Sequence, residues 1–117
     1  MGTSGAGRFS DYSANAEINI CDQIIENELL ENYGDYDFSK KSLLIPVIDT
    51  PIHIEAKERI VVIETSTGNS IGALSTEYEK IRMCIAQGYI FKGKITSSDN
   101  TIPVSIRATL IGTKKKK

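Results

Sequence analysis

The feature that most constrains the fold is a pair of strand patterns near the C-terminal end of the chain. Tyr89–Thr96 (YIFKGKIT) and Ile102–Ile111 (IPVSIRATLI) are rich in β-branched and aromatic residues, and Ser97–Thr101 separates them with an Asp-Asn turn sequence. Alternation in the first strand puts Tyr89, Phe91, Gly93 and Ile95 on one face and Ile90, Lys92 and Lys94 on the other. The pattern predicts an antiparallel hairpin with one face in the core.

Shorter strand patterns precede this hairpin. Arg59–Thr65 (RIVVIET) is a β-branched run, Ser66–Ser70 (STGNS) supplies a turn, and Ile71–Leu74 predicts the returning strand. Leu43–Ile48 is an apolar run that contains Pro46, which is typical of an edge strand or a strand entry. We therefore expect several short antiparallel strands joined by tight turns.

The segment Glu17–Tyr33 supports two interpretations. As a helix it places Ile18, Cys21, Ile25, Leu29 and Tyr33 on one stripe at spacings of three and four. As a strand its alternation is less regular, but a β-rich architecture needs a strand at this point. We expect a strand within Ile24–Asn32 and keep the helix as the alternative.

One helix is well marked. Thr76 and Glu79 have the spacing of a capping box, and Gly88 is a typical helix stop. Tyr78, Ile81 and Ile85 then form a core stripe with Cys84 beside it. The expected fold class is α+β but mainly β: a small bent antiparallel sheet or partly open barrel of five to six strands, closed by one helix at Thr76–Gln87.

Composition divides the 117 residues into three parts. Residues 1–16 form a Gly/Ser-rich leader that we expect to be flexible, residues 17–112 a single β-rich domain, and residues 113–117 a basic tail. Residues 1–39 carry a net charge of −7 and the rest of the chain +6. Either the acidic segment is a solvated flank, or it docks on basic residues of the later strands or of a partner.

Few residues suggest chemistry. His53 alternates with Ile52 and Ile54, which predicts a place on the outer face of a strand. Cys21 and Cys84 are too few for a metal site or a secreted disulfide framework, and Cys84 is expected to be a small buried hydrophobe. The carboxylates between Glu26 and Asp37 lack the spacing of a calcium loop. We expect no metal, no cofactor and no enzyme activity.

Basic residues suggest a binding surface instead. Lys92, Lys94 and Arg107 could share the outer face of the terminal hairpin and follow a phosphate backbone. The run Lys114–Lys117 could contact an anionic surface, although a solubilising end is the simpler interpretation. Because Tyr89 and Phe91 are expected in the core, base stacking would be missing and nucleic-acid binding would be weak.

Residues 60–95 resemble the later half of a HIRAN domain. The similar stretch is IVVIETSTGNSIGALSTEYEKIRMCIAQGYIFKGKI: a strand, a glycine turn, a capped helix, a glycine and another strand. HIRAN domains are small barrel-like modules of DNA remodelling and repair proteins that bind single-stranded DNA ends. The resemblance implies a barrel. In HIRAN domains an acidic loop with Asn and Asp residues precedes this half. The corresponding segment here, TPIHIEAKER, has no such loop.

The N-terminus resembles a second group of proteins. Met1-Gly2-Thr3-Ser4-Gly5 is similar to the start of certain proteins of bacterial antiviral operons of the CBASS and Qat type. There a QueC-like enzyme couples a deazaguanine to the glycine exposed by removal of the initiator Met. The resemblance implies that Gly2 is modified and that Thr3, Ser4 and Gly5 are recognised by the partner enzyme.

Two functions are therefore expected from the sequence. The first is a non-catalytic accessory module of a bacterial defence or DNA-linked operon, whose N-terminal glycine tail a partner enzyme recognises or modifies. The alternative is a weak single-stranded nucleic-acid-binding module that uses Lys92, Lys94 and Arg107. The cytoplasm is the expected location, since no apolar run reaches the length that spans a bilayer and no secretory signal is evident.

Overall fold

The long terminal hairpin organises the molecule. In the computed structural model, which describes residues 20–114, β5 (Tyr89–Asp99) pairs with β6 (Ser105–Lys114) over almost their whole lengths. Tyr89, Phe91 and Ile95 are buried while Lys92 and Lys94 are exposed, so the predicted alternation is confirmed. At the turn, β5 extends farther than predicted, to Asp99 rather than Thr96, and β6 begins later, at Ser105 rather than Ile102.

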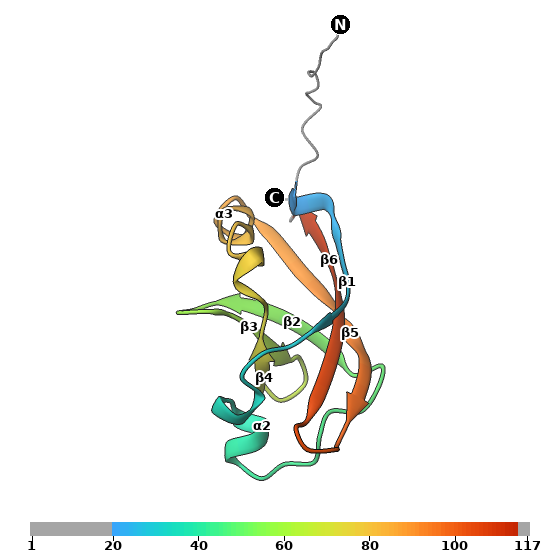
Figure 1. Cartoon of the computed structure of the whole chain (residues 1–117). Coiled ribbons are helices and arrows are strands. Elements are labelled where there is room, and N and C mark those ends of the chain that lie inside the picture. Colours follow the sequence, from blue (N-terminus) through green and yellow to red (C-terminus); the bar gives the residue numbers. More distant parts are fainter. Residues whose placement is uncertain (1–19, 115–117) are drawn as a thin grey trace, which may run out of the picture.

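The remaining strands extend this hairpin into one antiparallel sheet (Figure 1). They are β1 (Ile24–Leu29), β2 (Pro51–Ala56), β3 (Ile60–Glu64) and β4 (Ser70–Ala73). The strand order is β1-β6-β5-β2-β3-β4. Short helical segments complete the fold: η1 (Ile20–Asp22), η2 (Tyr33–Asp35), α2 (Asp37–Lys40), η3 (Thr76–Tyr78) and α3 (Ile81–Ala86).

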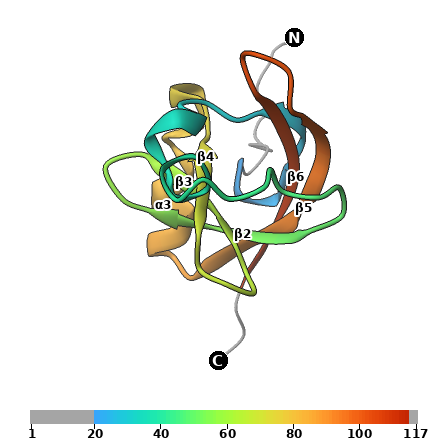
Figure 2. The ribbon, with the colours of Figure 1, turned by 90° about the horizontal axis from the view of Figure 1, so that it is seen from below.

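The sheet curls until its two edge strands almost meet. Just beyond β1, the amide of Glu31 donates to the carbonyl of Ala73 in β4 at 2.7 Å, and the amide of Ala73 donates back at 2.9 Å. Figure 2 shows the strands arranged around a common interior. The expected fold class, a mainly β, partly open antiparallel barrel closed by a helix, is therefore confirmed.

Aliphatic residues fill the barrel. The largest fully buried side chains come from every part of the sheet and from α3: Phe91, Ile52, Ile60, Ile71, Leu74, Ile81, Ile95, Ile106 and Leu110. Gly93 lets β5 and β6 cross closely, since a Cβ there would lie 1.7 Å from the carbonyl oxygen of Thr109. This interior is the modest, tryptophan-free core that the composition allows.

The ambiguous segment near the N-terminus is a strand. β1 contains a bulge between Ile25 and Glu28, where Asn27 adopts a left-handed φ of 51°. Because a bulge shifts the alternation by one residue, Ile25 and Leu30 both point inward although five positions separate them. This shift explains why the segment alternates poorly and why the helix alternative, which is wrong here, fitted its apolar spacing.

The predicted helix is divided. Thr76–Tyr78 forms the 3-10 turn η3 and Ile81–Ala86 forms α3, within the expected range Thr76–Gln87. The capping prediction was wrong by one residue, because the side chain of Ser75 accepts the hydrogen bond of the Glu77 amide. Glu79 instead pairs with Arg82. Gly88 ends the helix with φ of 100°, as predicted.

The segment Leu43–Ile48 is not the expected strand. It runs without regular structure from α2 to β2, across one end of the barrel (Figure 1). A strand needs a neighbouring ladder, whereas this segment is tied only by single bonds, among them that of the Ser98 hydroxyl to the carbonyl of Pro46. Pro46 is buried and Ile45 is half-buried against the core, whereas Leu44 and Val47 are exposed.

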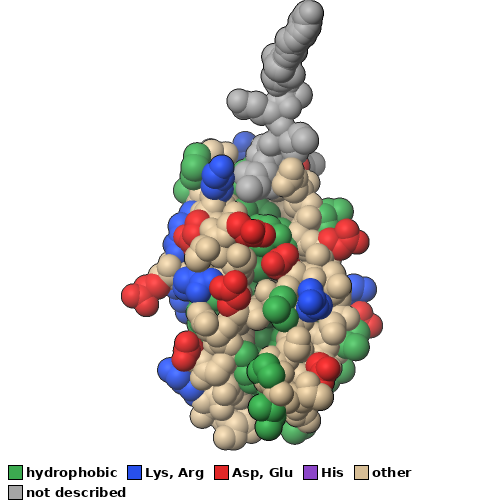
Figure 3. All heavy atoms as spheres, viewed as in Figure 1, with side chains coloured by type: hydrophobic (Ala, Val, Ile, Leu, Met, Phe, Trp, Pro, Cys, Tyr) green, Lys and Arg blue, Asp and Glu red, His purple; other side chains and the backbone are tan. Residues whose placement is uncertain are grey.

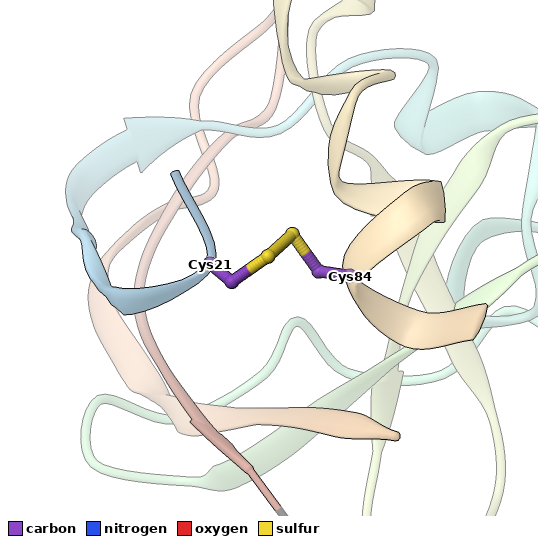
Figure 4. Close-up of a disulfide and its surroundings, with 2 residues drawn as sticks. All are labelled: Cys21 and Cys84. Atoms are coloured by element: carbon purple, nitrogen blue, oxygen red, sulfur yellow. A yellow bond between two sulfur atoms is a disulfide. The ribbon is translucent and has the colours of Figure 1, made fainter. Parts of the chain in front are cut away.

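The two cysteines form a disulfide, contrary to expectation. Cys21 in η1 and Cys84 in α3 are joined with a Cα–Cα distance of 5.5 Å, across 63 positions of sequence (Figure 4). Cys84 is buried, as expected, but not as a free thiol. The pairing depends on the barrel, which carries η1 past α3, and two isolated cysteines give no local sign of it.

Candidate interaction surfaces

The three predicted nucleic-acid residues lie on the outer face of the β5–β6 hairpin. Lys92 and Lys94 are exposed on β5, and Arg107 is half-buried on β6 between the buried residues Ile106 and Ala108. Register places Lys94 opposite Thr109 and Arg107 opposite Ser97. The face that the sequence predicted therefore exists, with Arg107 near the turn end and Lys92 farther along it.

Two of these cations already have partners. The Nζ of Lys94 lies 3.3 Å from the Oδ1 of Asp49, and the Arg107 guanidinium donates to the carbonyl of Asn27 at 3.1 Å. Among the described residues, only Lys92 of the three has no ion pair or side-chain hydrogen bond. The Asp49 carboxylate therefore offsets the charge of Lys94, whereas Arg107 keeps its charge because its partner is a neutral carbonyl.

Asn27 is a residue that the sequence analysis missed. Its backbone amide donates to Thr109 Oγ1 at 2.9 Å, and its side-chain oxygen accepts from the Thr96 hydroxyl at 2.8 Å. With the Arg107 contact, these bonds fasten the bulge of β1 onto the outer face of the hairpin. An Asn within a strand pattern signals a left-handed backbone position, which is the only local sign of the bulge.

An apolar surface lies at the end of the barrel away from α3. It consists of four exposed aliphatic side chains of the loop before β2, and we call it the distal apolar cluster: Leu43, Leu44, Val47 and Ile48. Leu44 is 90% exposed and Val47 72%. Figure 3 shows hydrophobic side chains gathered at this lower end. The sequence analysis assigned these residues to a strand.

The backbone beneath the cluster is firmly attached. The amide of Asp49 donates to the carbonyl of Ile95 at 2.8 Å, and Pro46 packs inward with its carbonyl bound by Ser98. Leu43 is held by its amide bond to the carbonyl of Phe38. The backbone of the loop is therefore anchored at Leu43, Pro46 and Asp49, while its aliphatic side chains face solvent.

His53 lies on the outer face of β2, as predicted, with Ile52 and Ile54 buried behind it. Its Nε2 is 3.3 Å from a carboxylate oxygen of Glu55 and its Nδ1 is 3.0 Å from the Thr65 hydroxyl. A carboxylate only accepts, so Nε2 donates to Glu55 and, in the neutral ring, Nδ1 accepts from Thr65. His53, Glu55 and Thr65 therefore form a hydrogen-bonded group of side chains on the outer face of the sheet.

The acidic N-terminal segment docks on later parts of the chain. Arg59 donates to Glu31 and to the carbonyl of Leu74, each at 2.7 Å, and the Glu31 contact raises the pKa of Arg59. The Tyr78 hydroxyl donates to Glu28 at 2.9 Å. Partial burial, reinforced by the Glu28 carboxylate, raises the pKa of Tyr78 to about 12. These contacts hold β1 against η3 and β3.

Other features bear on catalysis and location. Within residues 20–114, the surface has no detectable pocket and no cluster of three or more potential metal ligands. No helix of that part of the chain is long and apolar enough to cross a bilayer. The cytoplasm stays a prediction, although a disulfide is more typical of oxidising compartments.

The leader residues predicted to be modified or recognised lie outside the part of the chain that the structure describes. These are Gly2, Thr3, Ser4 and Gly5, and the same holds for Lys115, Lys116 and Lys117 of the basic tail. Lys114 is the last residue of β6. Comparison of the chain with protein-family models, with curated proteins and with solved structures gives no match.

Proposed function

We propose that this chain is a non-catalytic binding module whose distal apolar cluster docks a partner protein. The observation that carries the proposal is the exposure of Leu44 and Val47, which face solvent from a loop whose backbone is anchored at Pro46. Large aliphatic side chains gathered on one exposed surface are typical of protein interaction sites. Burying one such side chain contributes about 1.5–3 kcal/mol, so a few of them supply substantial binding energy.

The charges beside the cluster favour an apolar protein surface as the occupant. Asp49 follows the loop directly and is paired with Lys94, so the two neutralise each other. The four side chains of the cluster are all uncharged. A polyanion would find no net attraction here, whereas a protein with a complementary apolar patch would bury both surfaces.

Site-specific photo-crosslinking tests this proposal. A photoreactive residue at position 44, in cells that naturally produce the protein, should trap one different protein, while the same residue at position 83 should not. Met83 is the matched control because it is 65% exposed but lies on α3 at the other end of the barrel. The purified partner should then bind the Leu44→Gln/Val47→Gln variant at least tenfold more weakly than the wild type or Met83→Gln.

Three results would contradict it. Equal crosslinking from positions 44 and 83 would indicate random collision. A crosslink only to a second copy of this chain would make the cluster a self-association surface. Unchanged affinity of the double variant would remove the cluster from the interface. Circular dichroism of both variants separates loss of binding from loss of fold.

The N-terminal leader extends the proposal to a bacterial defence or DNA-linked operon. The support is the similarity of Met1–Gly5 to leaders that a QueC-like enzyme modifies, with Gly2 as the acceptor and Thr3, Ser4 and Gly5 as the recognised residues. Intact mass and N-terminal peptide mapping, on protein made beside its operon neighbours, should show an addition on Gly2. An unmodified Gly2 under those conditions would count against this part of the proposal.

Nucleic-acid binding is a second candidate because Lys92, Lys94 and Arg107 share one outer face of the hairpin. The pairing of Lys94 with Asp49 weakens it, and the burial of Tyr89 and Phe91 removes stacking surfaces from that face. Fluorescence anisotropy with a labelled single-stranded oligonucleotide at low salt would detect such binding, which should weaken steeply as salt rises and on Lys92→Ala substitution. Absence of any anisotropy change at low salt would exclude it.

A further inference from the structure

The ladder between β1 and β6 is interrupted by a bulge, which the bonds of Asn27 to Thr96, Thr109 and Arg107 fasten to the hairpin. β1 is an edge strand, and its register with β6 includes Ile24–Ile111 and Ile25–Leu110, then breaks at the bulge before resuming at Glu28–Ala108 and Leu29–Arg107. A short edge strand interrupted by a bulge is among the first parts of a sheet to open. Additional contacts must therefore hold β1 in place.

Those contacts cross the seam between β1 and the helical segment that follows β4. At its start, the Cys21–Cys84 disulfide ties the segment before β1 to α3 (Figure 4). In its middle, Tyr78 donates to Glu28, and beyond its end Glu31 exchanges two backbone bonds with Ala73. Only the disulfide is covalent, and it lies nearest the two register pairs before the bulge.

Next to the disulfide, the backbone of Cys21 packs against β5 and β6. A Cβ at Gly112 would lie 2.3 Å from the carbonyl oxygen of Cys21 and 2.6 Å from the ring of Phe91, so the backbone of Cys21 packs closely on this end of the barrel. Cys21 is 4% exposed and Cys84 is not exposed. A reductant therefore reaches the sulfur atoms only when this end of β1 moves.

We infer that the Cys21–Cys84 disulfide is a redox-sensitive latch on β1. In the oxidised protein the latch keeps residues 20–25 on the barrel. After reduction, only the two register pairs before the bulge and the packing of Cys21 on Gly112 hold this part of β1, so it opens from β6 while the rest of the barrel stays folded. Opening uncovers the edge of β6.

The reaction requires a dithiol reductant. One of its thiolates attacks the sulfur of Cys21, the more exposed of the two, and the Cys84 thiolate leaves and takes up a proton. The second thiolate of the reductant then attacks the mixed disulfide and releases Cys21, which is also protonated. The protein gains two hydrogen atoms as two thiols, and the reductant is oxidised to a disulfide.

Hydrogen–deuterium exchange with mass spectrometry tests the latch on the full chain. Peptides that cover residues 22–30 are compared with those that cover β3, residues 60–64, in oxidised and dithiol-treated wild type. Protection of 22–30 should fall at least tenfold more than protection of β3 on reduction, as expected for local opening in addition to any global loss of stability. The Cys21→Ser/Cys84→Ser variant should show the reduced pattern with or without dithiol.

Each alternative result overturns the inference. Unchanged protection of 22–30, when the mass shows the gain of two hydrogens, would mean that β1 does not need the bond. Equal loss of protection in 22–30 and β3 would indicate global unfolding rather than a latch. Failure of dithiol to reduce the native protein would make the bond purely structural. The wild-type comparison gives the answer even if the double serine variant does not fold.

Discussion

At the scale of single residues, Gly93 has the most demanding position. A methyl group there would meet the backbone of β6, with Thr109 O at 1.7 Å and the Cα of Leu110 at 2.9 Å. Since backbone atoms cannot turn aside, Gly93→Ala should lower the free energy of unfolding by about 3 kcal/mol in urea denaturation. Gly34→Ala is the control, because nothing lies within 4 Å of its added methyl, and it should change stability by less than about 0.5 kcal/mol. Equal effects would refute the close crossing of β5 and β6.

Tyr78 should make stability depend on alkaline pH. Its pKa is raised to about 12 in the folded protein, from the ordinary value of 10.0. Between these values the folded state holds a proton that the unfolded state has lost, so this contribution to stability is complete below pH 10 and is lost as pH rises through 12. The wild type minus Tyr78→Phe difference in unfolding free energy should shrink over this range. A constant difference would show that the pKa of Tyr78 is not raised in the folded protein.

At the scale of elements, Asp37 connects α2 to the edge of β4. Its carboxylate accepts from the amide of Ser70 at 3.0 Å, and its own amide donates to the Ser70 hydroxyl at 2.9 Å. The Ser70 amide holds the pKa of Asp37 below its ordinary value. The carboxylate therefore satisfies a backbone donor that an edge strand would otherwise leave open.

Asp37→Asn should weaken this connection. We expect the free energy of unfolding to fall by about 1 kcal/mol near neutral pH, because a neutral acceptor replaces a charged one in this hydrogen bond. Because the folded pKa is lowered, the wild-type advantage is present above the unfolded pKa and disappears as pH falls through the folded one. Urea denaturation at neutral and acidic pH measures it. Asp35 is an exposed carboxylate two positions away, and Asp35→Asn is the control, which should change stability by less than about 0.5 kcal/mol at neutral pH.

The elements also show how far the sequence could predict the structure. The β5–β6 hairpin, β3, β4 and the end of the helix at Gly88 follow from local alternation and turn residues, and these predictions are confirmed. Leu43–Ile48 has the composition of a strand, but no neighbouring strand is there to pair with it. Whether an apolar run is paired depends on where the barrel carries it. The exposure of Leu44 and Val47, and with it the distal apolar cluster, was for the same reason not predictable.

The candidate site residues could likewise be predicted only in part from the sequence. Alternation alone put Lys92 and Lys94 on the outer face, and the structure agrees. Their partners come from distant segments: Asp49 for Lys94, and the bulged Asn27 for Arg107. Cys21 and Cys84 are likewise brought together only by the closed barrel. Local patterns predict on which face a residue lies, but contacts between distant segments decide whether its charge or thiol is free.

At the scale of the whole molecule, a pair of backbone bonds, the side-chain bonds of Glu28 and Glu31, and one covalent link close the barrel within residues 20–114. The Glu31–Ala73 bridge joins the edges of the sheet, and the disulfide joins η1 to the helix at the end of the barrel. A chain of this size has little spare core, since a modest domain buries only about two-thirds of its unfolded surface. A covalent link between distant segments is therefore expected to account for a large share of its stability.

The contribution of the disulfide to the free energy of unfolding can be predicted from the length of the loop that it closes. The disulfide closes a loop of 63 positions, and the chain-entropy relation gives about 4 kcal/mol for a loop of this length, because the link restricts the unfolded chain. Cys21→Ser/Cys84→Ser should therefore lower the free energy of unfolding by about 4 kcal/mol in urea, with an unfolding midpoint that dithiol does not alter. Dithiol-treated wild type should unfold at nearly the same midpoint as the variant, while oxidised wild type unfolds at much higher urea. If the variant is as stable as the oxidised wild type, the link does not restrict the unfolded chain and the barrel closes without it. If reduced wild type is much more stable than the variant, the serine side chains, rather than the missing bond, cause the loss.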